Sequence, residues 1–142
     1  MIALDSSALL RYLTNDRPQL AEAVAAMIDG RDPVGISSLV LGETVHVLRG
    51  PPYLRTNPEL CDALVELLAH ENVVLTDLDS DVASAAIAGV RHLSPRHIID
   101  ALISAAARQA GAATLLTNDR KFASGLVPIQ QLEELESNED GR

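Results

Sequence analysis

Residues 33–48 decide the fold class, and they read Pro-Val-Gly-Ile-Ser-Ser-Leu-Val-Leu-Gly-Glu-Thr-Val-His-Val-Leu. The apolar burst at 33–36 predicts a short strand. Ser37 or Ser38 then offers a helix cap, because a serine hydroxyl can accept from the first free amides of a helix. Glu43 is the only formally charged residue in this stretch. The segment therefore predicts a strand that leads directly into a helix with one isolated acid.

The same alternation of strand and helix continues on both sides of this segment. Apolar residues recur at helical spacing in the stretches 20–28, 60–68 and 82–93. Short bursts of β-forming residues lie between the helices, and four of the five run apolar without alternation, as strands covered on both faces of a parallel sheet do. The expected strands are 1–4, 33–36, 72–75, 113–116 and 126–129. We therefore expect an α/β fold in three layers, a five-stranded parallel sheet flanked by helices, with its site at the carboxyl ends of the strands.

Length and composition limit the classes of protein to consider. The chain has 142 residues, of which 47% are apolar, and a formal charge of −9. We expect a single domain over residues 1–132 and an acidic, frayed tail over 133–142. The negative charge and the three aromatic residues argue against a base-stacking nucleic-acid platform. Cys61 is the only cysteine, which excludes an internal disulfide and a multi-thiolate zinc site. We find no secretion signal and no membrane-spanning run, so we expect a cytoplasmic protein.

Four acids stand alone in the most apolar parts of the sequence. Asp5 and Asp119 follow the first and fourth expected strands, whereas Glu43 and Asp100 lie inside apolar helical segments. An ionised carboxylate in apolar surroundings is costly unless a cation or hydrogen-bond donors compensate it. If the strands that carry Asp5 and Asp119 are neighbours, the four acids meet at one rim of the sheet. Carboxylates packed so closely favour a shared polyvalent cation, and oxygen-only ligands favour Mg²⁺ or Mn²⁺.

Each acid also has a structural interpretation, and these alternatives remain open. Asp5 can cap the first helix, and Asp119 can occupy a turn. Glu43 and Asp100 lie too far inside their helices to cap them, so pairing with an arginine is the main alternative for both. The arginines concerned are Arg11, Arg49 and Arg96.

Other catalytic patterns are missing from the sequence. The histidines, His46, His70, His92 and His97, do not have the spacing of a zinc motif. Ser6 and Ser7 lack the glycines of a nucleophile elbow and are better explained as caps. Phosphate-binding glycine loops are also missing, so the sequence does not indicate a nucleotide cofactor.

Four pieces of the chain, in this order and at these separations, resemble one family. They are Met-Ile-Ala-Leu-Asp-Ser-Ser-Ala-Leu-Leu at 1–10, Ile-Ser-Ser-Leu-Val-Leu-Gly-Glu at 36–43, Ile-Ile-Asp-Ala-Leu-Ile-Ser-Ala-Ala-Ala at 98–107 and Leu-Leu-Thr-Asn-Asp-Arg-Lys-Phe at 115–122. Together they resemble the PIN-domain ribonucleases, and more narrowly the toxins of VapBC toxin-antitoxin pairs. The resemblance runs over nearly the whole chain, from residue 2 to residue 129.

The resemblance implies a function and a set of site residues. It implies that the catalytic, metal-binding acids are Asp5, Glu43, Asp100 and Asp119, and that the hydroxyls of Thr117 and Ser7 support them. It also implies an endoribonuclease that depends on Mg²⁺ or Mn²⁺, is blocked by a cognate antitoxin and forms a homodimer. Two positions depart from the pattern of many relatives, which carry acids where this chain has Lys121 and His97.

RNA binding needs positively charged side chains that contact the phosphates. The candidate phosphate contacts are Arg11, Arg49, Arg96, Arg120 and Lys121.

Two other functions compete with RNA cleavage. A phospho-aspartate receiver also gathers acids at strand ends and binds Mg²⁺, but it is expected to have adjacent acids after the first strand, where Asp5 is followed by two serines. A non-catalytic binding module with the same fold is the other alternative.

Overall fold

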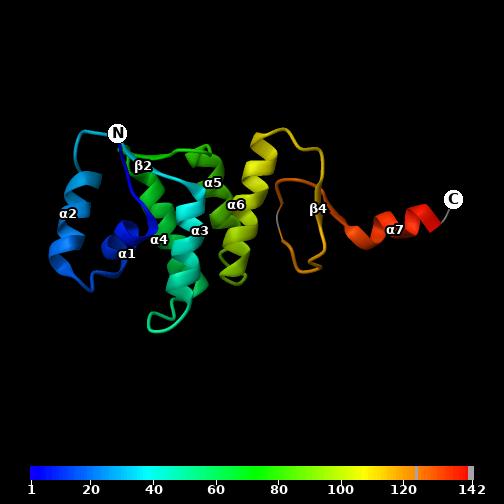
Figure 1. Cartoon of the computed structure of the whole chain (residues 1–142), viewed down its shortest axis with the longest axis horizontal. Helices are drawn as coiled ribbons and strands as arrows, with labels where there is room; N and C mark the ends of the chain where they lie inside the picture. Colours follow the sequence, from blue (N-terminus) through cyan, green and yellow to red (C-terminus); the bar gives the residue numbers. More distant parts are fainter. Residues whose placement is uncertain (124, 141–142) are drawn as a thin grey trace.

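The computed structural model describes residues 1–123 and 125–140, and it has an α/β architecture with seven helices and parallel strands (Figure 1). In chain order the elements are β1 (Ile2–Ala3), α1 (Ser6–Thr14), α2 (Pro18–Ile28), β2 (Val34–Ile36), α3 (Ser38–Arg49), α4 (Asn57–Ala69), β3 (Val73–Leu75), α5 (Ser80–Gly89), α6 (Arg96–Gln109), β4 (Leu115–Thr117), β5 (Ile129–Gln131) and α7 (Leu132–Asp140). Within the described residues, no helix is long and apolar enough to cross a membrane.

The strands form two separate sheets. β1, β2 and β3 lie side by side in that order and run parallel, and β4 pairs in parallel with β5. The prediction of one five-stranded sheet is therefore wrong for the described part of the chain. The reason lies in the path after α6, which carries β4 to the side of that helix away from the three-stranded sheet (Figure 1). β4 therefore bonds to β5 and not to β1.

The last two strands also begin later than expected. β4 starts at Leu115 and β5 at Ile129, whereas the sequence predicts strands over 113–116 and 126–129. After α6 the chain first makes a turn at Gly111, whose φ of 83° suits a residue without a side chain. Pro128 has no amide to donate, and its carbonyl instead accepts from the amide of Leu115 at 2.8 Å.

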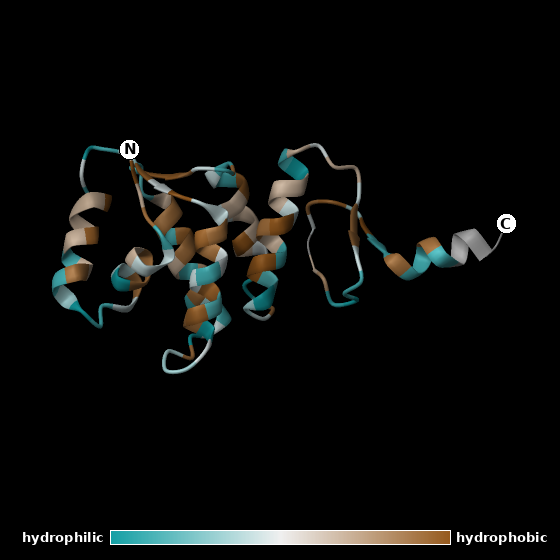
Figure 2. Cartoon of the chain, in the orientation of Figure 1, coloured by the Kyte–Doolittle hydropathy of each residue, from teal (hydrophilic) through white to brown (hydrophobic). Residues whose placement is uncertain are grey.

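The core is built around the middle strand and the inner faces of the helices. β2 is buried along its whole length, as expected for a strand between two others. Figure 2 shows apolar residues concentrated on the strands and on one side of the helices in the body of the molecule. The largest fully buried side chains come from six helices and β2, and they include Leu9, Ile28, Ile36, Leu41, Leu64, Leu67, Ile87 and Ile98.

Several helix starts are fixed by side-chain caps. Ser37, one of the two serines expected there, caps α3, and Asp79 caps α5. α4 is capped by Thr56, because the hydroxyl of Thr56 and the carboxylate of Glu59 bond to each other's backbone amides in a capping box. Asp5, and not Ser6 or Ser7, caps α1.

The acidic C-terminal segment differs from the expected frayed tail. Residues Leu132–Asp140 form α7, which projects away from the body (Figure 1), and the end of the expected tail, 141–142, lies outside the described residues. Glu133 and Glu134 lie in the first turn, where negative charge stabilises the helix dipole. Glu133 also forms an ion pair with Arg120.

Candidate active site

The first candidate acid, Asp5, lies where β1 ends and α1 begins. Its Oδ1 accepts from the hydroxyl of Ser7 at 2.6 Å and from the amide of Ala8 at 3.0 Å. These donors, led by Ser7, hold the pKa of Asp5 below its usual value. Asp5 is therefore a cap, and its exposed carboxylate stays ionised at neutral pH.

Glu43 is joined to this corner by Ser6. The hydroxyl of Ser6 donates to Glu43 Oε2 at 2.8 Å, which ties the start of α1 to the second turn of α3. Because Ser6 directly follows Asp5, the two acids come from distant parts of the sequence to one place. None of the three arginines proposed from the sequence, Arg11, Arg49 and Arg96, forms an ion pair with Glu43 in the described part of the chain.

Asp100 lies in the second turn of α6 and is the one buried carboxylate among the described residues, with 9% of its surface exposed. Burial raises its pKa above the usual value, because the charged form loses contact with water. The amide of Ala123, at 3.5 Å, and the nearby positive charge of Arg96 offset this effect in part, and the charge of Asp119 adds to it. Asp100 thus lies beside a second acid in a poorly solvated position.

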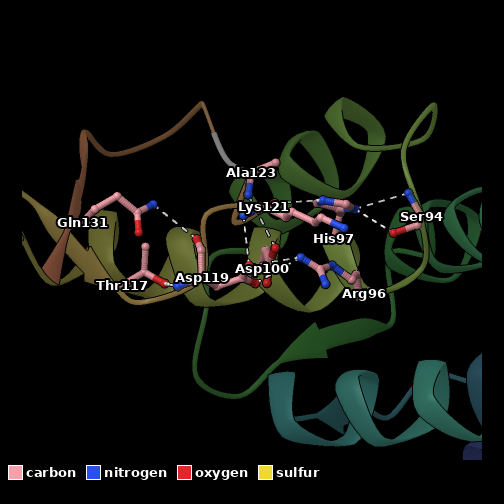
Figure 3. A network of polar contacts seen from close by, with 9 residues as sticks. All are labelled: Ser94, Arg96, His97, Asp100, Thr117, Asp119, Lys121, Ala123 and Gln131. Atoms are coloured by element: carbon pink, nitrogen blue, oxygen red, sulfur yellow. Dashed lines mark hydrogen bonds and ion pairs between the residues drawn. The ribbon is translucent and has the colours of Figure 1, made fainter. Parts of the chain in front are cut away.

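Asp119 follows β4 and faces α6 (Figure 3). Its carboxylate accepts from Arg96 at 3.0 Å and from the amide of Lys121 at 2.9 Å. Its own amide donates to the hydroxyl of Thr117 at 3.0 Å, so Thr117 supports the turn. Asp119 therefore has a guanidinium partner, which the sequence offered for Glu43 and Asp100.

His97 fastens the loop after β4 to α6. Its Nδ1 lies 2.8 Å from the hydroxyl of Ser94 and its Nε2 lies 3.1 Å from the carbonyl oxygen of Lys121 (Figure 3). Together with the Arg96–Asp119 ion pair, this contact holds the Asp100–Asp119 region in place. His97 acts here on loop position, a role that sequence spacing did not indicate.

The structure thus brings the four acids together in two pairs. One pair, Asp5 and Glu43, joins α1 to α3, and the other, Asp100 and Asp119, joins α6 to the loop after β4. Among the described residues, no three His, Cys, Asp or Glu side chains lie close enough together to hold one metal ion. The single rim expected from the sequence required β1 and β4 to be neighbours, and they are not.

These residues fit Mg²⁺ or Mn²⁺ by their chemistry but not by their arrangement in one copy. Carboxylate oxygens are the ligands that such hard ions prefer, and a desolvated acid beside a like charge is a typical metal ligand. The buried Asp100 and its acidic neighbour Asp119 meet that description. The two pairs of acids are too far apart in one copy to hold the same metal ion among the described residues.

Three of the candidate RNA-binding cations already pair with acids. Arg11 bonds to Asp16, Arg96 to Asp119 and Arg120 to Glu133. Arg49 lies 3.5 Å from Nδ1 of His46 on the exposed face of α3. Lys121 lies directly beside the Asp119 carboxylate, to which its backbone amide donates.

Two features of this region are not predicted by the sequence. Asp77, just after β3, accepts from the amide and the hydroxyl of Ser38 at 2.9 and 2.6 Å and so fixes the start of α3. An acid directly after an apolar strand, as at Asp5, is the signal that could have identified it. An open apolar groove of about 620 Å³ runs between α3 and α6, and its polar lining residues are Ser6, Ser38, Glu43 and His46.

Comparison with known proteins agrees with this architecture. The family model described as PIN domain matches residues 2–124 of the chain. No protein among the curated sequences matches it.

Proposed function

Because this chain belongs to the PIN domain family, whose members are generally nucleases, we propose that it is a metal-dependent endoribonuclease that hydrolyses RNA phosphodiester bonds. The observation that carries this proposal is the buried carboxyl of Asp100 with Asp119 beside it. Burial of the Asp100 carboxyl and the like charge of Asp119 both disfavour the ionised form of Asp100. A divalent cation offsets both effects.

The proposed roles follow from the positions of the acids. Asp5, Asp100 and Asp119 hold Mg²⁺ or Mn²⁺, and Glu43 orients and deprotonates the attacking water. Ser7 and Thr117 keep Asp5 and the turn at Asp119 in place through their hydroxyls. Lewis-acid polarisation of the scissile phosphate is the chemistry that such an ion supplies when bound.

RNA binding must overcome the formal charge of −9. The proposed phosphate contacts are Arg11, Arg49, Arg96, Arg120 and Lys121. Arg96 and Arg120 lie on either side of the Asp119 loop and become available when their acidic partners are neutralised or displaced. If Asp119 held a divalent cation, Arg96 would be released from its ion pair and could contact an RNA phosphate.

We further propose that the protein is the toxin of a toxin-antitoxin pair and that it forms a homodimer. The groove between α3 and α6 supports an antitoxin partner, since it is largely apolar and open and carries Glu43 at the candidate site. An antitoxin segment with apolar residues and an arginine fits this surface. Co-expression with the product of a short adjacent gene should give a stable complex, and a failure to co-purify would contradict this part.

Cleavage of a labelled RNA tests the main proposal. We expect cleavage with Mg²⁺ or Mn²⁺, none with EDTA, and none with Asp100→Asn under either condition. Ser84→Ala, on the distant helix α5, is a control and should cleave normally. Binding without cleavage would indicate a non-catalytic module, and an acyl phosphate on an aspartate would indicate a receiver.

A further inference from the structure

The three-stranded sheet ends in an open edge at β1. The amides of Ile2 and Leu4 donate to the carbonyls of Pro33 and Gly35 in the β2 segment, at 3.0 and 2.9 Å. Backbone groups of successive residues in a strand point in opposite directions, so the amide and carbonyl of Ala3 point away from β2. Ala3 is exposed, and Ile2 is 44% exposed. A parallel strand is normally covered, so this edge has the character of an incomplete sheet.

β4 has a matching open edge. The amide of Leu115 donates to the carbonyl of Pro128 beside β5, so the backbone groups of the next residue, Leu116, point to the other side. The side chain of Leu116 is 49% exposed. A sheet of two short strands is only marginally stable in water, and it gains from a third strand.

The two edges fit each other in direction and in chemistry. If the outward backbone groups of Ala3 and Leu116 bond across a parallel pair, Ala3 lies opposite Thr117 and Ile2 opposite Leu116. Asp5 and Asp119 are then each two residues beyond the Ala3–Thr117 pair. The acids then project from the same end of the joined sheet. The exposed apolar side chains of Ile2 and Leu116 lose contact with water at the same time.

The chain cannot make this pair with itself as it is folded. β4 lies on the far side of α6 from β1 (Figure 1). Three contacts hold it there (Figure 3). They are the ion pair between Arg96 and Asp119, the hydrogen bond between His97 and the carbonyl of Lys121, and the hydrogen bond from the amide of Ala123 to Asp100. A second copy can offer its β4 edge with all these contacts intact.

We propose that β4 of one copy adds to the free edge of β1 in a second copy, and that the active site is shared between the two. Asp5 and Glu43 then come from one copy, and Asp100 and Asp119 from its partner. This arrangement explains why the acids form two pairs in one chain, and why no three metal-binding side chains meet among the described residues. The strand pairing stands alone, whereas the shared chemistry rests on the proposed function.

Disulfide trapping tests the strand pairing without any use of activity. Neighbouring strands are about 4.8 Å apart, which is within reach of a disulfide. Ile2→Cys and Leu116→Cys proteins, mixed and treated with a mild thiol oxidant, should yield at least about tenfold more covalent dimer than either protein alone. Both positions are exposed, and the native Cys61 is buried, so neither folding nor background oxidation interferes.

A matched control uses the opposite edge of the same sheet. Val74 of β3 is 37% exposed, and Val74→Cys mixed with Leu116→Cys should give only the background level of dimer. Equal trapping in this control overturns the pairing. So does a double variant, Ile2→Cys with Leu116→Cys, that closes its disulfide within one chain.

Mixing of inactive variants tests the shared site. Asp5→Asn and Asp119→Asn are each inactive, but half of the dimers in an equal mixture contain one intact site, so about a quarter of the activity should return. Asp100→Asn mixed with Asp119→Asn should stay inactive, because both residues come from the same copy. The shared site is overturned if the dimer is trapped and the wild type cleaves RNA, but mixing of the variants restores no cleavage. A wild type that trapped well and did not cleave would instead count against the nuclease function.

Discussion

At the scale of single residues, Asp100 is the clearest case of a side chain whose position costs stability. Its carboxyl is buried, and the only hydrogen bond to that carboxyl identified in the described residues is the long one from Ala123. The raised pKa means that ionisation is less favourable in the folded chain than in the unfolded one. The proposed metal-binding role accounts for a carboxyl in this position.

Asp100→Asn should therefore remove activity and increase stability. RNA cleavage should fall by at least about 100-fold, and the Tm at neutral pH should rise. Because the folded-state pKa is raised, Asp100 favours folding only while it is protonated, and this contribution is lost as the pH rises through the folded pKa. The difference in Tm between variant and wild type should thus shrink on acidification. A lower Tm for the variant at every pH would contradict this view.

Asp5 combines a structural and a chemical role that two variants can separate. Asp5→Asn keeps an oxygen for the amide of Ala8 and should leave the Tm close to that of the wild type, whereas Asp5→Ala loses the cap and should lower it. Both variants should lose RNA cleavage. Thermal unfolding and cleavage assays on the same preparations check the two effects, and full activity in Asp5→Asn would remove Asp5 from the site.

Arg96 should compete with a metal ion for Asp119. The ion pair is partly exposed, so Arg96→Gln should change the free energy of unfolding by less than about 1 kcal/mol. Without the guanidinium, the concentration of Mg²⁺ that gives half-maximal cleavage should decrease. Arg91→Gln, which breaks the exposed pair with Asp62, is the matched control and should leave that concentration unchanged.

At the scale of elements, Asn57 links two helices. Its side-chain amide donates to the carbonyls of Val90 and Arg91 at 2.8 and 3.1 Å, which joins the start of α4 to the end of α5. Loss of a buried side chain that satisfies two carbonyls leaves both without their partner. Nothing in the local sequence reveals these distant partners of Asn57.

Asn57→Ala should lower the free energy of unfolding by about 1–3 kcal/mol, as measured by urea denaturation. Asn72→Ala removes a similar bond, to the carbonyl of Met27 at 3.0 Å, from a less buried position. Its effect should be smaller, at or below about 1 kcal/mol. Equal losses in the two variants would show that burial does not set the cost at Asn57.

Local patterns predicted most elements but not their association. Helical periodicity and caps such as Ser37 and Asp79 act within a few residues, so the sequence locates the helices well. The position of β4 depends on contacts between Asp119 and Arg96, 23 residues apart, which no periodicity encodes. For the same reason the sequence identified Asp100 and Asp119 as isolated acids but could not show that the four acids would form two pairs.

At the scale of the whole molecule, charge opposes RNA binding. α7 projects from the body and adds acids near Arg120, one of the proposed phosphate contacts (Figure 1). Removal of residues 133–142 eliminates five acids and one arginine. The molecule then has a weaker negative field, and its cations are more accessible to phosphates.

This truncation should increase the affinity for RNA, measured by fluorescence anisotropy in the Asp100→Asn background so that the RNA stays intact. The gain should decrease as salt is added, since it is electrostatic. A full-length variant with Gln in place of Glu133, Glu134 and Glu136 should show part of the same gain. A gain on truncation but none with the glutamines would assign the effect to α7 itself and not to its charge.

The open edges of β1 and β4 also affect how the protein behaves in concentrated solution. Because the two edges belong to different strands, copies that join without closing into a pair leave one edge exposed at each end, and further copies can add to form a linear polymer. Mutual repulsion between copies with a charge of −9 slows this growth at neutral pH. Near the isoelectric point, about 4.7, that repulsion vanishes, and we expect filament formation to remove protein from solution.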